Sequence, residues 1–398
     1  MAPDLSAALR QRVERSVGAY RSRFGLDPTW VGWGPGRVNL IGEHTDYNQG
    51  LAMPAAIDRW VVVALGAGPD GQLVVRGEDF DDECTLALGR PAPSHAPSWQ
   101  RYAAGCVAEL AALQPLRTGL QAVVAGDVPL GAGLSSSAAV EMAWLNVLRL
   151  ASGAQLSGLE LAQAAQRVEH RHLGLASGLL DQLASQFSRV HRLMVVDFES
   201  LEIRWVPAGL PRWTWVVVES GVRRELAASA YRDRVAECQL GLALARGSDA
   251  ELRGYRGLGA SHLELLERQG HALVAQRLGH VMDENQRVLA MERALASGDA
   301  AGAGALLCAS HASLRDLYQV SCAELDALVE LCIAWPGCAG ARMVGGGFGG
   351  CVLALVQVDA AQGLPAYLAR AYAPRFPHRL RSWQFALVGG AGAVRWEG

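Results

Sequence analysis

The feature that most restricts the fold is a run of glycine near the end of the chain. Between residues 345 and 350, five of the six positions are glycine, and the run precedes a strand-like segment at 352–356. Glycine loses more conformational freedom on folding than any other residue, so such a run suits only a backbone that other residues cannot follow, or one that passes very close to a neighbour. The run is therefore either a loop that faces a ligand or a tight turn packed against another loop.

A second segment of small residues, Gly131 to Ser137, lies between a predicted strand at 120–125 and a predicted helix at 135–150. The start of a helix offers unpaired N–H groups and the positive end of the helix dipole, which suit an anion such as phosphate. Ser135 or Ser136 could instead cap the helix, and the segment would then be an ordinary turn. Its glycine spacing matches neither a Walker A loop nor a dinucleotide-binding fingerprint.

All 36 basic residues are arginine, because the chain contains no lysine. This composition excludes a Walker A lysine, the strand lysine of protein kinases and a Schiff-base lysine. The formal net charge of −3 gives no basic surface for nucleic acid, and no uncharged apolar run reaches the roughly eighteen residues of a membrane span. We expect a cytoplasmic protein with reduced cysteines, since their spacing fits neither a zinc site nor a disulfide scaffold.

The order of the predicted elements favours an α+β fold, since strands and helices segregate instead of alternating one for one. We predict helices at 5–24, 135–150, 158–173, 225–246, 259–269, 280–297, 299–317 and 322–334, and strands at 30–40, 60–65, 73–76, 84–88, 120–125, 192–197, 213–219, 341–344, 351–357 and 382–388. A chain of 398 residues exceeds the size of a single core. The proline-flanked segment 207–211 is the best candidate for a boundary, which gives domains of 1–209 and 210–398.

The densest polar segment runs from Gly36 to Asn48 and contains Arg37, Glu43, His44 and Asp46. Donors and acceptors crowded into a short loop are typical of a site that binds several hydroxyl groups, since each polar group of the site needs a partner on the ligand. A solvated surface turn has the same composition. The spacing of the acidic residues and the histidine matches neither a zinc nor a calcium site.

Asp181 lies twelve residues after Glu169, in an apolar stretch that begins at Gly178. A carboxylate in such surroundings is a candidate general base, because burial and a cationic neighbour control its ionisation. The simpler alternative is a helix N-cap residue.

These segments together resemble one enzyme family. The segment GRVNLIGEHTDYNQG, residues 36–50, resembles the signature of galactokinases. The segment VPLGAGLSSSAAVE, residues 128–141, resembles the ATP loop of the wider superfamily of galactokinase, homoserine kinase, mevalonate kinase and phosphomevalonate kinase, the GHMP kinases. Residues 342–351 are similar to the last motif of that superfamily. Weaker similarity links the three motifs, so the resemblance covers nearly the whole chain in the right order.

The resemblance implies a role for each residue of these motifs. Asp181 would take the proton from the anomeric hydroxyl of galactose, and Arg37 would stabilise the charge on the phosphoryl group during transfer. The implied sugar-binding residues are Glu43, His44, Thr45, Asp46, Gly178 and Tyr231. Those that would hold the triphosphate are Gly131, Ala132, Gly133, Leu134, Ser135, Ser136 and Ser137. Ser137 and Glu169 would bind Mg²⁺, and Trp99 and Tyr102 would lie near adenine.

The resemblance also implies a two-domain, GHMP-kinase-like α+β fold with the active site at the domain interface, and a monomer with galactose and ATP as its small-molecule partners. The implied reaction is ATP-dependent phosphorylation of α-D-galactose at C1, which gives galactose 1-phosphate and ADP. Phosphoryl transfer requires mainly positioning and charge neutralisation, which Mg²⁺, a helix N-terminus and one arginine supply without a lysine. The alternatives are a related kinase for another sugar or small alcohol, and a non-catalytic galactose and ATP sensor, against which Asp181 argues.

Several positions depart from the family pattern. Val344 stands where threonine is usual, and Glu219 stands where asparagine or aspartate is common. Residues 176–177 and Leu180, on either side of the candidate sugar-binding glycine, also differ from the commonest residues. These departures concern the fine specificity for the substrate more than the chemistry.

Overall fold

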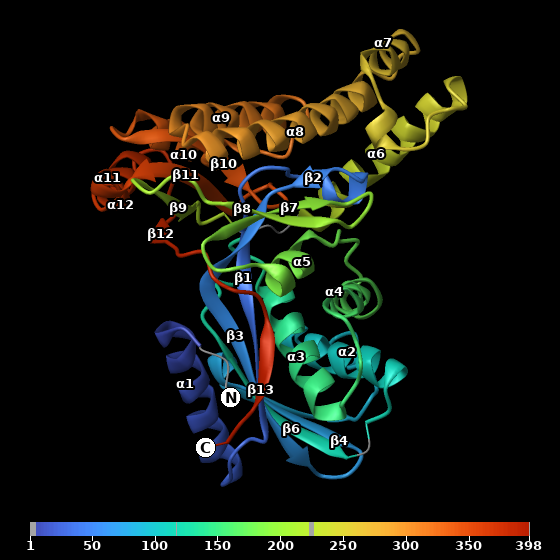
Figure 1. Cartoon of the computed structure of the whole chain (residues 1–398), viewed down its shortest axis with the longest axis vertical. Coiled ribbons are helices and arrows are strands. Elements are labelled where there is room, and N and C mark those ends of the chain that lie inside the picture. The colour runs from blue at the N-terminus through green and yellow to red at the C-terminus, as the bar shows by residue number, and fades with distance from the viewer. Residues whose placement is uncertain (1–4, 117, 223–226, 398) are drawn as a thin grey trace.

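The fold was obtained as a computed structural model, and it describes residues 5–116, 118–222 and 227–397. A six-stranded sheet forms the lower part of the molecule in Figure 1, and most of the C-terminal helices form the upper part. Strands and helices are both abundant and largely segregated, which confirms the α+β class predicted from the sequence.

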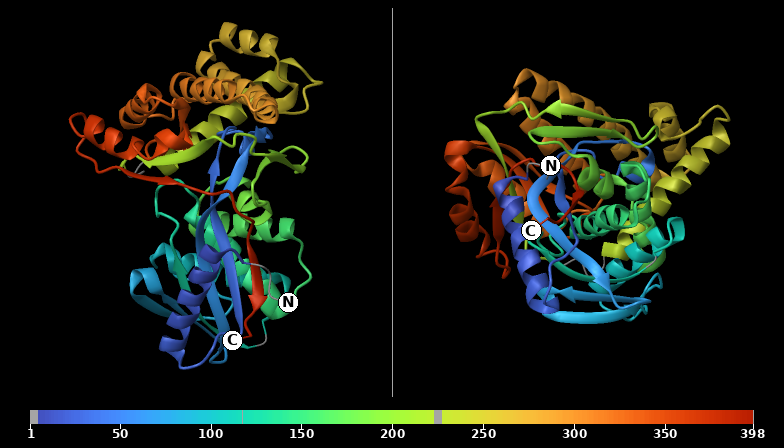
Figure 2. Two further views of the ribbon diagram at one scale, coloured as in Figure 1. Left: turned by 60° about the vertical axis from the view of Figure 1, so that its left-hand side comes forward. Right: turned by 60° about the horizontal axis from the view of Figure 1, so that its bottom comes forward.

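The first sheet has the strand order β13-β1-β3-β6-β4-β5. Its strands are β1 (Trp30–Asn39), β3 (Pro54–Gly68), β4 (Gln72–Gly77), β5 (Asp82–Ala87), β6 (Gly119–Gly126) and β13 (Gly392–Arg395). Helix α1 (Ala7–Phe24) covers one face, and helices α2 (Ser98–Leu113) and α3 (Ser136–Ser152) cover the other (Figures 1 and 2). Because both faces are covered, the segment Val61 to Leu65 is an unbroken apolar run instead of an alternating one.

The upper sheet has the strand order β10-β11-β9-β12. Its strands are β9 (Trp213–Glu219), β10 (Cys338–Val344), β11 (Cys351–Gln357) and β12 (Arg381–Gln384). Side chains alternate between its two faces. Trp215 and Val217 join the core that is continuous with the first sheet, whereas Val216 and Val218 pack against the C-terminal helices. One face of this sheet is therefore turned toward the first part of the chain.

The upper helices are α6 (Ala227–Ser248), α7 (Ala260–Arg268), α8 (Ala272–Ser297), α9 (Ala300–Asp316), α10 (Ala323–Ala334), α11 (Val358–Ala361) and α12 (Leu364–Tyr372). A small third sheet joins β2 (Leu51–Ala52), β7 (Arg192–Asp197) and β8 (Ile203–Pro207) between the two parts. Helices α4 (Gly158–Arg167) and α5 (Leu180–Phe187) complete the first part, linked in part by a π-helical turn, Val168–Leu173.

Most of the predicted elements are present within a few residues of their expected ends. The exceptions are informative: the helix predicted at 158–173 becomes the π-helical turn after Arg167, and α8 begins at Ala272, before the expected 280. The first residues of the helix predicted at 225–246 lie outside the described part of the chain. Helices α2, α5, α11 and α12 and strands β2, β8 and β13 were not predicted.

The end of the chain returns to the first sheet. Strand β13 pairs antiparallel with β1, Trp30 opposite Arg395 and Trp33 opposite Gly392. The division into 1–209 and 210–398 remains a prediction, and the segment between β8 and β9 does connect the lower and upper parts. A split at this point would assign β13 to the C-terminal half, although β13 pairs with β1 of the N-terminal half.

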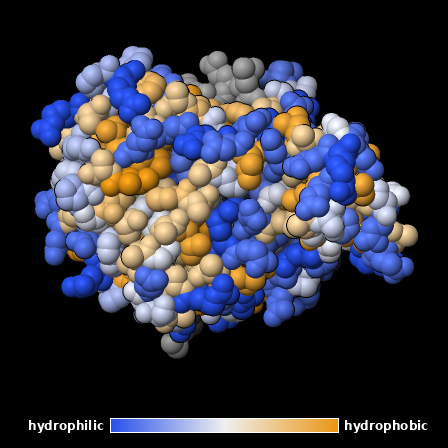
Figure 3. Space-filling view, turned by 90° about the horizontal axis from the view of Figure 1, so that it is seen from above, coloured by the Kyte–Doolittle hydropathy of each residue, from blue (hydrophilic) through white to orange (hydrophobic). Residues whose placement is uncertain are grey.

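Seen from above, the upper face mixes hydrophilic residues with small hydrophobic patches (Figure 3). Among the residues that the structure describes, no helix combines the length and the apolar character that crossing a bilayer requires.

Candidate active site

The centre of the site is an ion pair between two elements that are far apart in the sequence. Arg37 follows an irregularity in the pairing of β1 with β3, and such irregularities redirect side chains. Its Nε donates to Oδ1 of Asp181 at 2.7 Å, and its Nη1 donates to the carbonyl of Gly133, also at 2.7 Å. The arginine side chain is 8% exposed and the aspartate 30%, so the carboxylate is the partner that a ligand can reach.

Asp181 lies in the first turn of α5, where Leu179 occupies the N-cap position. The alternative reading of Asp181 as a helix cap is therefore wrong. Its second oxygen, Oδ2, accepts a hydrogen bond from the hydroxyl of Ser135. Arginine, serine and a helix start thus fix the orientation of this carboxylate.

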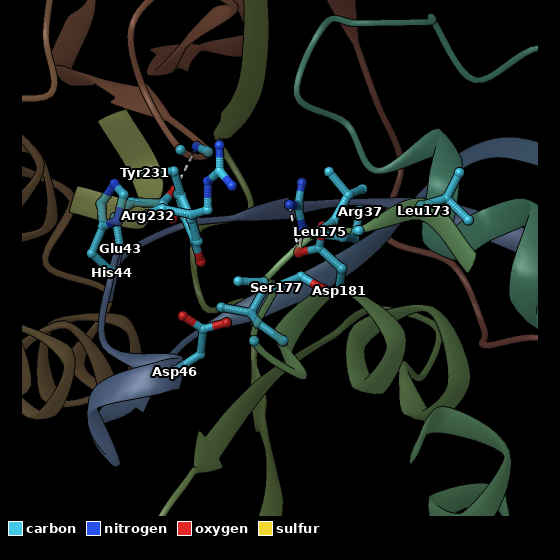
Figure 4. A pocket seen from close by; sticks show the side chains of 16 residues that line it. Arg37, Glu43, His44, Asp46, Leu173, Leu175, Ser177, Asp181, Tyr231 and Arg232 are labelled. Atoms are coloured by element: carbon cyan, nitrogen blue, oxygen red, sulfur yellow. Dashed lines mark hydrogen bonds and ion pairs between the residues drawn. The ribbon is translucent and has the colours of Figure 1, made fainter. Parts of the chain in front are cut away.

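One cavity, of about 550 Å³, opens beside this pair. It brings together Arg37 and Asp181, most of the implied sugar-binding residues and two glycines of the C-terminal run: Glu43, His44, Asp46, Gly178, Tyr231, Gly345 and Gly346. In Figure 4, Asp46 and Tyr231 lie on the far side of this space from Arg37, with Glu43 and His44 beside the tyrosine. The polar loop is therefore a cavity wall and not a solvated surface turn.

The C-terminal glycine run both faces this cavity and packs as a tight turn. Gly345, Gly347, Gly349 and Gly350 have positive φ angles, which L-residues with side chains rarely adopt. The N–H of Gly345 donates to Oε1 of Glu43 at 2.8 Å. The run therefore forms a tight turn that also lines the cavity, and contact with a ligand stays a prediction.

Glu43 is held by a buried cation that the sequence did not single out. Nη2 of Arg342, on β10, lies 2.9 Å from Oε1 of Glu43, and its Nη1 donates to the carbonyl of Leu40 at 2.9 Å. The arginine is completely buried. This pair joins the polar loop to the upper sheet across the wall of the cavity.

His44 begins a chain of hydrogen-bonded rings behind the cavity. Its Nδ1 lies 2.7 Å from the hydroxyl of Tyr47, which lies 2.9 Å from the hydroxyl of Tyr318. The thiol of Cys238 is 3.1 Å from that second hydroxyl. Burial raises the pKa of both tyrosines well above the usual range, so they remain neutral hydrogen-bonding groups.

Asp46 is a cavity carboxyl group whose ionisation is strongly perturbed. Burial, and then the negative charges of Asp181 and Glu43, raise its pKa from 3.8 to about 7. Gly178 makes room for this carboxylate, because a Cβ at residue 178 would lie 1.7 Å from Oδ2 of Asp46. The implied sugar-binding role of Gly178 is thus one of close approach, since it contributes no side chain.

Thr45 was expected among the sugar-binding residues, and here the structure differs. Its hydroxyl lies 2.8 Å from the carbonyls of both Gly42 and Leu51, and the residue does not belong to the cavity wall. Thr45 stabilises the turn that carries His44 and Asp46. A threonine hydroxyl that bonds its own loop is not available to a ligand.

A second cavity, of about 770 Å³, lies on the other side of the ion pair. Its walls include Arg37 and Asp181 again, together with five of the implied triphosphate-binding residues, Gly131, Gly133, Ser135, Ser136 and Ser137. Ser135 is the N-cap residue of α3 but has left-handed backbone angles, and its hydroxyl bonds Asp181 instead of the helix. The expected N-cap bond is therefore absent, and the first N–H groups of α3 receive no side-chain acceptor from Ser135.

Ala132 and Leu134 point away from this cavity. Both side chains are buried in the core. The carbonyl of Ala132 accepts a hydrogen bond from the thiol of Cys351 at 2.8 Å, and the carbonyl of Leu134 accepts one from the N–H of Arg37 at 3.0 Å. These two residues anchor the loop and do not line the space in which a triphosphate would lie.

The two residues implied for Mg²⁺ are adjacent in the structure. The side chain of Ser137 is close enough to Glu169 to favour the ionised carboxylate, which also accepts hydrogen bonds from Ser177 and, at 3.1 Å, from Gln182. Burial, assisted by the charge of Asp181, raises the pKa of Glu169. A carboxylate and a hydroxyl beside a phosphate-sized cavity fit the oxygen ligands that Mg²⁺ prefers. No cluster of three or more acidic, histidine or cysteine ligands occurs in the described residues.

The two aromatic residues implied for adenine binding contact different parts of the structure. Trp99 stacks on Phe80 with ring centres 5.8 Å apart, near the outer edge of the first sheet. Tyr102 instead lies near Ser137 and Glu169, the candidate Mg²⁺ residues, which both affect its pKa. Neither residue lines the two cavities.

Comparison with known proteins identifies the family. Residues 18–67 match the galactokinase galactose-binding signature, residues 101–189 match the N-terminal domain of GHMP kinases, and residues 291–373 match the GHMP kinase C-terminal family. A galactokinase of Chloroflexus aurantiacus is 40% identical over 368 residues, which cover 91% of this chain and 93% of the relative. The chain belongs to the galactokinase family.

Other galactokinases agree in sequence and in structure. The human galactokinase is 38% identical over 368 residues, covering 89% of this chain and 92% of that protein. The crystal structure of Lactococcus lactis galactokinase complexed with galactose superposes with a TM-score of 0.87 at 29% identity and covers 97% of this chain and 99% of that one. The GHMP-kinase fold and the family resemblance read from the motifs are confirmed, and the chain is a kinase that transfers a phosphoryl group to a hydroxyl.

Sequence reasoning missed several side chains of this galactokinase-family site. Gln182 donates to Glu169 and, at 3.2 Å, to the buried carboxyl of Glu141. Arg342 holds Glu43, and Arg381 of β12 lines the second cavity. Gln182 directly follows Asp181 and could have been found by that position, but a contact between residues 43 and 342 leaves no local signal in the sequence.

Proposed function

We propose that this galactokinase-family chain uses ATP to phosphorylate the C1 hydroxyl of α-D-galactose, which gives galactose 1-phosphate and ADP. One observation carries the proposal: the Arg37–Asp181 ion pair lines both cavities. A hydroxyl in the first cavity and a phosphoryl group in the second would meet at this pair. Such placement of two reactants is the main contribution that a protein makes to phosphoryl transfer.

Asp181 is the base in this proposal. Its carboxylate accepts the proton of the C1 hydroxyl, while the hydroxyl oxygen forms a bond to the γ-phosphorus and the bond from that phosphorus to ADP breaks. Arg37 orients the carboxylate through its 2.7 Å bond and places positive charge where the phosphoryl group passes. The Ser135 hydroxyl fixes the other carboxylate oxygen.

The first cavity has the polar groups that a sugar requires. Glu43, His44, Asp46 and Tyr231 present acceptors and donors to a small, enclosed space. A sugar hydroxyl would donate to the Asp46 carboxylate, which has no room for a bulkier neighbour than Gly178. An analogue without such a hydroxyl would leave these groups unpaired, which is the physical basis of selectivity for a sugar.

The second cavity has the features of a triphosphate site. The start of α3, Gly131 and Gly133 offer N–H groups, and Ser136 and Ser137 offer hydroxyls. Ser137 and Glu169 would hold Mg²⁺. When bound, this ion would supply positive charge to the nucleotide phosphates.

We also propose that the protein is a monomer of the cytoplasm. None of its eight cysteines, all in the described part of the chain, forms a disulfide, which fits a reducing compartment. Size-exclusion chromatography with light scattering would test the monomer, for which a mass near 42.3 kDa is expected.

The decisive assay supplies Mg-ATP and a panel of sugars and small alcohols and follows ADP release. We expect release to depend on galactose and the product to be phosphorylated at C1, as read by ³¹P NMR. Faster release with another sugar would favour the related-kinase alternative. A protein that binds galactose and ATP without releasing ADP would be the non-catalytic sensor, and the proposal would be wrong.

Variants of the ion pair test the assigned roles. Asp181→Ala is expected to lower kcat by about 10²–10⁴-fold, the usual range for a general base, while galactose still binds. Arg37→Ala is expected to lower kcat far more than it weakens galactose binding. If turnover survives the loss of Arg37, the assignment of the catalytic cation is wrong.

A further inference from the structure

The second cavity has one wall that the family motifs do not supply. Arg379, Arg381 and Glu219 line it together with the residues of the Gly131–Ser137 loop. Arg381 lies on β12, the edge strand of the upper sheet, and Glu219 lies on the neighbouring strand β9 (Figure 1). The two residues are direct cross-strand neighbours. Arg381 donates hydrogen bonds to both carboxylate oxygens of Glu219, from Nε at 2.6 Å and from Nη2 at 3.0 Å.

A row of three side chains fixes this wall against the loop. Cys351 of β11 is the cross-strand neighbour of Glu219 on its other side. Since directly paired residues point to the same face of a sheet, Cys351, Glu219 and Arg381 share one face. The Cys351 thiol donates to the carbonyl of Ala132, within the loop. These three side chains therefore connect the Gly131–Ser137 loop to Arg381 in the cavity wall.

Charge and exposure distinguish the two members of the ion pair. The Glu219 side chain is 13% exposed, whereas that of Arg381 is 57% exposed. The carboxylate is thus the fixed anchor, and the guanidinium presents unused N–H donors to the space beside it. In the described part of the chain, no carboxylate forms an ion pair with Arg379. Among the described residues that line the cavity, three are arginines, Arg37, Arg379 and Arg381, and two are carboxylates, Asp181 and Glu219, so positive charge is in excess among them.

We propose that Arg379 and Arg381 bind the phosphate groups of the nucleotide from the side opposite the glycine-serine loop, and that Glu219 positions Arg381. The guanidinium fork matches the oxygens of a phosphate, and its charge strengthens each hydrogen bond. This inference rests on the proposed function only in that the ligand of the second cavity is a nucleoside triphosphate.

The ion pair also makes the Glu219 carboxylate compatible with a phosphate site. A carboxylate beside a phosphate site is unfavourable when it is unpaired. Arg381 offsets that charge and adds donors of its own. The glutamate and the arginine therefore act as one unit in which the anion holds the cation in place.

Direct nucleotide binding tests the arginines. Titration calorimetry with Mg-AMPPNP, a non-hydrolysable ATP analogue, would compare the unaltered protein with Arg379→Gln, Arg381→Gln and the double variant. We expect each single change to weaken binding about fivefold to tenfold, the usual effect of losing a charge-assisted hydrogen bond at a partly exposed site, and the double change to weaken it further. Galactose binding should remain unchanged. Arg375→Gln, an exposed arginine on the same C-terminal segment and outside the cavity, is the matched control and should bind normally.

The positioning role of Glu219 needs a double-mutant cycle. Glu219→Gln is expected to weaken Mg-AMPPNP binding severalfold when Arg381 is present and not to weaken it when residue 381 is glutamine. Arg381→Lys should restore part of the affinity. Equal weakening in both backgrounds would overturn the positioning role.

Two other results would overturn the proposal about the arginines. Binding of the double variant within twofold of the unaltered protein would show that they do not contact phosphate. An equal loss of galactose and nucleotide binding, with a lower melting temperature, would show a purely structural role. Because this test does not depend on turnover, normal Mg-AMPPNP binding without galactose-dependent ADP release would refute the proposed function and leave the inference intact.

Discussion

The position of Gly178 has no room for a side chain, because the carboxylate of Asp46 lies directly beside it. A Cβ at this residue would lie 1.7 Å from Oδ2 of Asp46, far inside van der Waals contact. We expect Gly178→Ala to displace Asp46 and to weaken galactose binding about tenfold or more, as for a lost hydrogen bond to a charged group. Gly18→Ala on α1, where nothing lies within 4 Å of the new Cβ, is the matched control. Calorimetric titration with galactose measures both, and normal affinity of the Gly178 variant would contradict a role for Asp46 in sugar binding.

Asp46 should make galactose binding depend on pH. Its pKa is raised from 3.8 to about 7, so the empty site loses its carboxylate charge as the pH falls through 7. A sugar hydroxyl that donates to this group favours the ionised form. Galactose affinity is therefore expected to be full above about pH 8 and to fall toward tenfold per pH unit below 7, where binding releases one proton from Asp46.

Asp46→Asn, which cannot ionise, serves as the control and should remove this dependence whatever its affinity. Calorimetry in buffers of different ionisation enthalpy would detect the linked proton. The raised pKa also means that Asp46 favours folding at low pH, below 3.8, and that this contribution is lost as the pH rises through 7. Affinity that is flat between pH 6 and 8 would show that Asp46 does not bind the sugar as a carboxylate.

Single residues of the site could be found from the sequence when they belong to a contiguous motif. Arg37, Glu43 and Asp181 were identified in this way, and the structure brings them to the cavity walls. Thr45 shared the same loop but bonds its own backbone, which motif membership cannot distinguish from ligand contact. Arg342 belongs to the motif at 342–351, but its pairing with Glu43, about 300 residues earlier, was not predicted, because only the fold joins the two residues.

The elements of the fold follow from local patterns where those patterns are long. Helices α9 and α10 and strand β11 were predicted nearly to their ends, since each has a clear apolar period. Helix α5 has only eight residues and begins after Leu179, which is not a capping residue, so no start signal was present. The sequence of the π-helical turn at 168–173 continues a helical apolar pattern. The turn differs from an α-helix in its backbone hydrogen bonds, which this pattern does not indicate.

Strand β10 carries the buried cation that joins it to the polar loop. Arg342 is fully buried, and its removal would leave Glu43 with the N–H of Gly345 and no counter-charge. We expect Arg342→Met to lower the free energy of unfolding by about 3–5 kcal/mol, as for other buried pairs that lose one partner. Urea denaturation measures this change.

Two further variants separate lost charge from lost volume. Arg268→Met, on the exposed surface of α7, should change the unfolding free energy little. Glu43→Gln combined with Arg342→Met should recover part of the loss, because the uncompensated carboxylate is then absent. A double variant as unstable as Arg342→Met alone would show that packing, and not charge, is the cause.

At the scale of the whole molecule, the last strand completes the first sheet. Strand β13 covers the edge of β1, and none of its residues lines either cavity. A chain that ends at Ala391 is expected to melt roughly 5 °C or more lower and to aggregate, since it exposes the backbone of β1. Arg395→Ala, which keeps the strand, should behave normally. Differential scanning calorimetry would decide, and an unchanged melting temperature would show that β13 contributes nothing to stability.

Local sequence patterns predicted the arrangement of the whole molecule less well than they predicted single residues or elements. The sequence predicted an α+β class, and its family resemblance predicted two domains with the site between them. The return of residues 392–395 to the first sheet was not predicted, because a short edge strand has no periodicity of its own. The arrangement of two cavities around one ion pair depends on the packing of the upper sheet against the glycine-serine loop, to which Cys351 and Ala132 contribute.

The shared wall of the two cavities has a consequence for inhibitor design. Among the residues that the structure describes, only the Arg37–Asp181 pair contributes to both walls, so ligands in the two spaces would meet at these side chains. A bisubstrate compound that joins a sugar analogue to a nucleotide through a short phosphate tether would occupy both spaces at once. Its second half would bind at the high effective concentration that a short linker provides, so affinity would rise well above that of either half.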